Sequence, residues 1–74
     1  MPKKTDNELA NRLRELRTAN NMTQQELADL VDVSRQTIIA IEKGQYNPTT
    51  MLALKLARVF ATAVEKIFWL NENK

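Results

Sequence analysis

The 74-residue chain contains no cysteine and no histidine, and it has a single glycine. Without cysteine and histidine the sequence offers no thiolate nucleophile, no imidazole base, no disulfide and no thiolate-rich zinc site. One glycine is too few for the glycine-rich loops that cradle phosphates in nucleotide-binding proteins. The composition therefore argues against an enzyme, and it predicts no metal site and no cofactor.

Long hydrophobic segments are also missing. No apolar run approaches the roughly 20 residues of a membrane-spanning helix, and the first residues lack the apolar core of a signal peptide. We therefore expect a cytoplasmic protein with no membrane partner. The 11 Lys and Arg and the 9 Asp and Glu leave a net charge of only +2, so the positions of the charges matter more than their sum.

The apolar residues that are present recur at three- and four-residue spacing, and no segment shows the two-residue alternation of a strand. This pattern predicts an all-α fold, a compact bundle of five short helices over about residues 7–20, 24–31, 35–43, 50–61 and 63–68. A chain of this length has room for one small domain with a thin core. We expect a single domain over residues 1–74, with a core between about residues 7 and 70.

Each predicted helix begins at a residue whose side chain can cap it. The candidate caps, three of them in capping boxes, are Thr5 with Glu8, Thr23 with Glu26, Ser34, Thr49, and Thr62 with Glu65. Gly44, the single glycine, stands where a left-handed residue would close the third helix.

The second and third predicted helices have about eight residues each, and only three residues separate them, which is the helix-turn-helix arrangement. Ala28 supplies a small side chain where the two helices would cross. Asp32 occupies the first turn position, which favours a left-handed backbone that Asp adopts at a cost of about 1 kcal/mol relative to Gly. A right-handed Asp32 would change both the crossing angle and the direction of the following helix.

Three sequence strings resemble the Cro/phage-repressor (XRE) family of DNA-binding regulators: TQQELA at residues 23–28, VSRQTI at 33–38 and IEKGQYNP at 41–48. The resemblance extends from about residue 13 to residue 68 and is greatest with small stand-alone members such as the dimeric cytolysin repressor. It implies the phage-repressor type of helical bundle, with the helix-turn-helix as the DNA-binding unit. Members of the family usually have Gly at the position of Asp32, and they place an ion pair at the positions of Arg17 and Glu42.

The resemblance also implies which residues contact DNA. They are Gln24, Ser34, Arg35, Gln36, Thr37, Ile39, Ala40, Lys43, Tyr46 and Asn47. We expect Gln24 to contact a phosphate, and the alternative is that it is merely a polar first-turn residue. Gln36 matches the edge of adenine, and Arg35 matches either guanine or a phosphate.

The remaining predicted contacts each have a simpler alternative. Ile39 can contact a thymine methyl group or be an isolated apolar residue at the surface. The resemblance places Lys43, Tyr46 and Asn47 against the DNA backbone. Lys43 could instead be a solvated charge, and Tyr46 could contribute only packing.

The chain end at Phe68, Trp69 and Leu70 is more apolar than a terminus in water requires. Closure of the core accounts for Phe68 alone, so we expect this end to form a homodimer interface. The sequence thus predicts a sequence-specific regulator of transcription, a repressor, that inserts its third helix in the major groove of a palindromic operator in double-stranded DNA.

We expect no small-molecule effector. Three alternatives share the fold: an antitoxin, the controller of a restriction–modification operon, and a protein-interaction module that has lost DNA binding.

Overall fold

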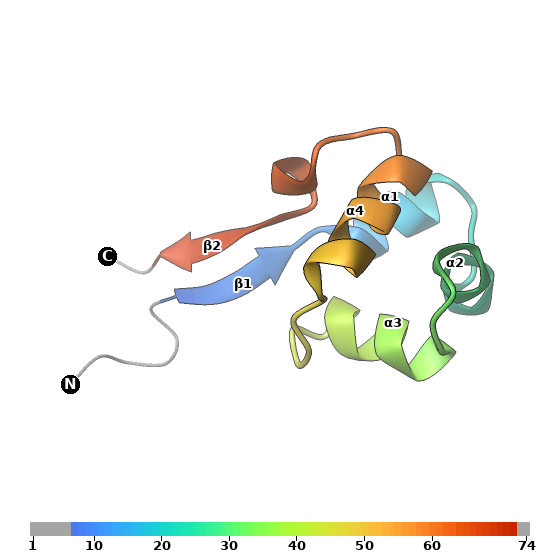
Figure 1. Ribbon diagram of the computed structural model, residues 1–74, viewed down its shortest axis with the longest axis horizontal. Helices are drawn as coiled ribbons and strands as arrows, with labels where there is room; N and C mark the ends of the chain where they lie inside the picture. The colour runs from blue at the N-terminus through green and yellow to red at the C-terminus, as the bar shows by residue number, and fades with distance from the viewer. Residues whose placement is uncertain (1–6, 73–74) are drawn as a thin grey trace.

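Helices and a small sheet together make up the part of the chain that the computed structural model describes, residues 7–72 (Figure 1). The elements, in order, are β1 (Asn7–Asn11), α1 (Leu13–Ala19), α2 (Gln24–Val31), α3 (Arg35–Glu42), α4 (Thr50–Val59), the 3-10 helix η2 (Val64–Lys66) and β2 (Phe68–Glu72). The helices surround one core, and the two strands extend away from it as an antiparallel pair.

The predicted all-α class is wrong at both ends of the chain. Residues 7–11 form a strand, so the first helix begins at Leu13, and the predicted fifth helix is only the 3-10 turn Val64–Lys66. The strands pair with Leu9 opposite Leu70 and Ala10 opposite Trp69. Neither strand alternates apolar and polar residues, since the sequences are NELAN and FWLNE, and each strand finds its partner at the other end of the chain.

Two of the predicted capping boxes are affected by this change. Thr5 lies outside the described residues, and the backbone of Glu8 belongs to β1. At the other end, Ala63 is the N-cap of η2 and no side chain caps it, so the predicted box of Thr62 with Glu65 is wrong.

The other predicted helix starts are confirmed. Thr23 Oγ1 accepts from the Glu26 N–H at 3.0 Å, and the Thr23 N–H donates to Glu26 Oε1 at 2.8 Å, which completes the capping box of α2. The Ser34 hydroxyl caps α3, and the Thr49 hydroxyl caps α4. These local bonds satisfy backbone donors that a helix start leaves without partners.

The helix-turn-helix of α2 and α3 is present, and Asp32 is left-handed as expected, with φ 63° and ψ 45°. The N–H of Val33 donates to the Ala28 carbonyl at 3.0 Å, which secures the turn. Ala28 is fully buried. Gly44, with φ 75°, follows α3 in the predicted left-handed conformation.

The core is built from all four helices and from the segment that leads into β2. Its buried apolar residues are Leu13, Leu27, Ala28, Val31, Ile38, Ile41, Leu52, Leu56, Ala57, Ile67 and Phe68. α2 and α3 therefore bury their inner faces together, which leaves the outer face of α3 available for contacts. Within residues 7–72, no helix has the length and apolar character needed to cross a membrane.

One side chain connects the sheet to the end of α3. Asn11 Nδ2 donates to the Ile41 carbonyl at 3.0 Å, and Asn11 Oδ1 accepts from the Leu13 N–H at 3.0 Å. Asn11 thus fixes the last residue of β1 to the start of α1 and to the end of α3.

The left-handed backbone of Asp32 leads to a prediction about stability. Asp32→Gly should raise the free energy of unfolding by up to about 1 kcal/mol, because glycine has no Cβ to clash in this conformation. Asp32→Val should lower it, because β-branched residues fit this region worst. Urea unfolding at one fixed protein concentration measures both changes, and equal stability of the two variants would contradict the strain at this position.

Candidate nucleic-acid interface

A buried ion pair positions the helices on which the interface is built. Arg17 Nε lies 2.7 Å from Glu42 Oε2, and Arg17 Nη2 donates to Glu42 Oε1 at 3.3 Å. Arg17 Nη1 also donates to the Met22 carbonyl at 2.8 Å. Only 10% of the Arg17 side chain and 5% of the Glu42 side chain are exposed. The ion pair implied by the family resemblance is therefore present, and it joins α1 to α3.

Gln24 belongs to the same network. Its Nε2 donates to Glu42 Oε1 at 3.2 Å. An ionised carboxylate only accepts hydrogen bonds, so the amide must turn its NH₂ group toward Glu42, and the second N–H stays available. Glu42 thus fixes the orientation of the residue from which we expect a phosphate contact.

α3 presents a ridge between two grooves. Gln36, Ala40 and Lys43 form the ridge, since residues three and four apart lie on one helix face. On one side is a groove of about 850 Å³. Its lining comes from α1, α2 and α3: Arg14, Arg17, Met22, Thr23, Gln24, Gln25, Arg35, Ile39, Glu42 and Lys43. The groove therefore brings four of the predicted DNA contacts together, namely Gln24, Arg35, Ile39 and Lys43. Gln36 and Ala40 lie beside it on the ridge of α3.

The other groove, of about 290 Å³, is lined by Thr37 and Tyr46, neither of which lines the larger groove. Tyr46 is 42% exposed, so it is not a core residue, and Asn47 is exposed in the loop after α3. The Ser34 hydroxyl accepts from the Thr37 N–H at 3.2 Å and lies 3.1 Å from Thr37 Oγ1. Both hydroxyls thus support the start of α3.

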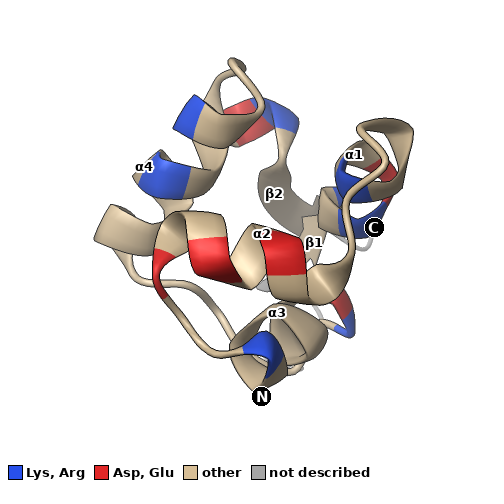
Figure 2. Cartoon of the chain, turned by 90° about the vertical axis from the view of Figure 1, so that its right-hand side faces the viewer, with Lys and Arg blue, Asp and Glu red and all other residues tan. Residues whose placement is uncertain are grey.

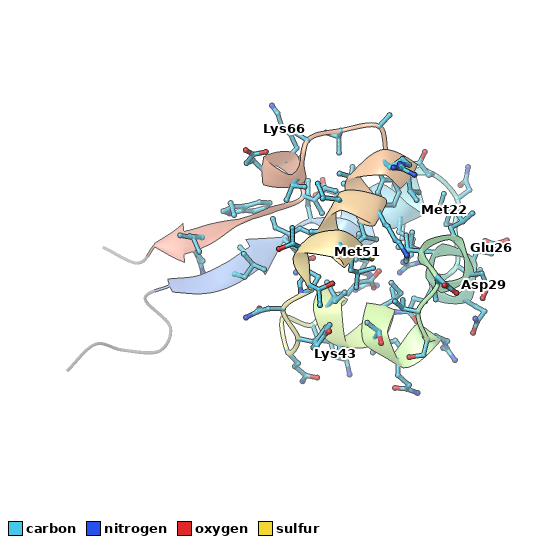
Figure 3. All side chains as sticks on the ribbon, in the orientation of Figure 1. Met22, Glu26, Asp29, Lys43, Met51 and Lys66 are labelled. Atoms are coloured by element: carbon cyan, nitrogen blue, oxygen red, sulfur yellow. The ribbon has the colours of Figure 1, made fainter. Side chains whose placement is uncertain are left out.

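The charges of the helix-turn-helix are separated between its two helices. α3 has one acidic residue, Glu42, and its carboxylate is turned inward to Arg17. Glu26 and Asp29 lie on the outer side of α2, away from Lys43 (Figure 3). Figure 2 shows the acidic residues along α2 and the basic residue that begins α3. The outer face of α3 is therefore cationic although the whole chain is close to neutral.

Arg14 was not among the predicted site residues, yet it lines the larger groove from α1. A signal was present in the sequence, because Arg14 is three residues before Arg17 and so shares its helix face. The sequence alone did not single it out, because the groove forms only where three helices meet.

The strand β2 places the predicted interface residues Trp69 and Leu70 on opposite faces of the sheet. Successive side chains of a strand point to opposite faces, so Trp69 shares one face with Ala10, and Leu70 shares the other with Leu9. Trp69 is 43% and Leu70 57% exposed, whereas Phe68 is only 6% exposed and packs in the core. Trp69 and Leu70 therefore cannot both lie at the centre of one flat interface.

A family model described as helix-turn-helix matches residues 13–67. The chain belongs to this helix-turn-helix family. An HTH-type transcriptional regulator of Archaeoglobus fulgidus is 51% identical over 63 residues, which cover 85% of this chain and 89% of that protein. Another from Bacillus subtilis is 44% identical over 65 residues, with coverage of 88% and 98%. These names describe regulators and not enzymes, in agreement with the sequence expectation.

A solved structure has the same fold as this helix-turn-helix protein. It is the restriction-modification controller protein C.AhdI from Aeromonas hydrophila, with a TM-score of 0.68 and 37% sequence identity. The match covers 73% of this chain and 82% of the controller protein. The family resemblance seen in the sequence is thus confirmed by both sequence and structure.

The buried ion pair can be tested by breaking it. Arg17→Met should lower the free energy of unfolding by about 3–5 kcal/mol, because it leaves the Glu42 carboxylate buried without its partner. The double variant Arg17→Met, Glu42→Met should recover most of this loss, since a buried pair and an apolar pair of similar volume are close in stability. Urea unfolding measures both.

Arg12→Met is the matched control. Arg12 lies 3.9 Å from Glu15 in an exposed pair. Its loss should change stability by less than about 0.5 kcal/mol. A double variant no more stable than Arg17→Met alone would show that the two charges are not coupled.

Proposed function

We propose that this protein is a sequence-specific regulator of transcription that binds double-stranded DNA and inserts α3 in the major groove. The observation that carries the proposal is the outer face of α3, where Arg35, Gln36 and Lys43 are exposed while Glu42 is turned inward. Such a face combines cations for phosphates with side chains that hydrogen-bond to base edges. The names of the relatives support the same function.

The position of each residue on α3 or just after it determines whether it contacts a base or the DNA backbone. Gln36, exposed on the ridge near the start of the helix, reads the edge of adenine, and Arg35 beside it reaches guanine or a phosphate. Ile39 is half-buried, so only part of its side chain is available for a thymine methyl group. Lys43, Tyr46 and Asn47 contact the DNA backbone on either side of this helix.

We further propose that a homodimer binds a palindromic operator, with half-sites about 10 bp apart, one helical turn. Leu70 marks the interface face, because Leu9 and Phe68 on that face line an apolar pocket together with Leu54, which is 58% exposed. We propose repression as the outcome, since a dimer bound across a promoter excludes polymerase by occupancy. No small-molecule effector is part of the proposal.

A second candidate within the same class is the controller of a restriction–modification operon. The likeness to C.AhdI favours it, because that structure is described as such a controller. A neighbouring endonuclease gene would distinguish this candidate. An interaction module without DNA binding is disfavoured by the cationic face of α3, which a protein-binding surface does not require.

The direct test is selection of bound fragments from a random DNA pool. We expect the selected fragments to share a palindromic sequence whose half-sites are about one helical turn apart. Fragments without a common sequence would overturn sequence-specific binding, and a single unrepeated half-site would overturn the dimer on DNA.

Two substitutions separate base reading from backbone contact. Gln36→Ala should weaken binding to the selected site by about tenfold and leave random DNA unchanged, because a good base contact is worth roughly 1–3 kcal/mol. Lys43→Ala should weaken both alike and reduce the salt dependence by about one unit. Fluorescence anisotropy at several salt concentrations measures these effects. Equal losses on both DNAs for Gln36→Ala would exclude it as a base reader.

The interface is tested by the two neighbours in β2. Leu70→Ala should raise the dimer dissociation constant by about a hundredfold, since each dimer would lose two buried leucine side chains worth about 1.5 kcal/mol each. Trp69→Ala is the matched control on the opposite sheet face and should have a smaller effect. Sedimentation equilibrium measures both constants. A larger effect of Trp69→Ala would move the interface to the other face, and no effect of either would place it away from β2.

A further inference from the structure

The larger groove beside α3 has cations on two of its three walls. Arg35 and Lys43 stand on the α3 wall, and Arg14 stands on the α1 wall. The floor between them holds the Arg17–Glu42 pair, whose charges cancel. The groove is therefore positive mainly because of residues at its rim.

Arg14 has no evident structural task. Its side chain is exposed, and it forms no ion pair with a carboxylate among the described side chains, unlike Arg12 and Arg17 on the same stretch of chain. An exposed guanidinium that has no ion pair among the described side chains, and that lines the groove beside a cationic helix, is available to an anion.

Other donors converge on the same groove. Gln24 has one side-chain N–H left after its bond to Glu42. The first turn of α2, at Thr23, Gln24 and Gln25, also lines the groove, and its free backbone N–H groups favour an anion at this end of the helix. The donors of α2 and the Arg14 side chain thus line one groove, which offers an anion partners from two helices.

We infer that Arg14 binds a DNA phosphate, and that it shares this phosphate with Gln24. The inference rests on the proposed function, because the anion is supplied by a duplex whose major groove holds α3. The phosphate strand then passes along the groove, between the α1 wall and the ridge of α3. The DNA footprint thereby includes α1, beyond the helix-turn-helix itself.

Arg14→Gln tests the inference on the full chain and on the site recovered from the random pool. We expect an affinity loss of about three- to tenfold on specific and random DNA alike, and a salt slope smaller by about one unit. Arg58→Gln is the matched control, since Arg58 is an exposed arginine near the end of α4 and does not line the groove. It removes the same charge and should change neither quantity. Circular dichroism and urea unfolding confirm that both variants fold.

The shared phosphate has its own readout. Single phosphates of the site are replaced in turn by neutral methylphosphonates, and the wild type should lose affinity at the position that Arg14 contacts. At that position the methylphosphonate should not weaken DNA binding by Arg14→Gln any further, because the contact is already missing. The double variant Arg14→Gln, Gln24→Ala should lose less affinity than the product of the two single-variant losses. Independent losses at every position would overturn a shared phosphate.

The two levels of the proposal fail in different ways. If Arg14→Gln keeps the wild-type affinity and salt slope while the wild type binds its site, the role of Arg14 is overturned and the DNA-binding function stands. If the wild type itself binds no DNA at low salt, the proposed function is overturned and the role of Arg14 with it.

Discussion

The ion pair between Arg17 and Glu42 is the interaction on which the rest of this small domain depends. Removing two charges from water is costly, and here two Arg17–Glu42 hydrogen bonds, the Met22 carbonyl and the Gln24 amide offset that cost. An apolar pair could stabilise the fold as well. The ion pair adds direction, because its hydrogen bonds hold α1, the start of α2 and the end of α3 at one mutual geometry.

The same pair shapes the electrostatics of the outer surface. By accepting from Arg17 and Gln24, Glu42 is removed from the face of α3, where an exposed carboxylate would repel phosphates. It also orients the Gln24 amide toward the groove lined by Arg14. The Glu42 carboxylate therefore contributes both to the stability of the fold and to the charge of the outer surface. The net charge of the chain shows neither contribution.

The helix-turn-helix and its caps could be predicted from sequence because their causes are local. Thr23 and Glu26 bond across three residues, Ser34 bonds to Thr37, and Asp32 adopts its left-handed conformation within the turn itself. The sheet could not be predicted in this way. β1 and β2 are each held by a partner at the opposite end of the chain, and the apolar spacing of their residues fits a helix equally well.

The sequence by itself determined the central helices, the Arg17–Glu42 pairing through family resemblance, and most of the residues exposed along α3. Only the tertiary structure decided that Trp69 and Leu70 face opposite ways and that Arg14 joins the groove beside α3. The physical reason is the range of the interactions. Caps and turns depend on neighbours a few residues away, whereas strand pairing and grooves depend on which distant segments pack together.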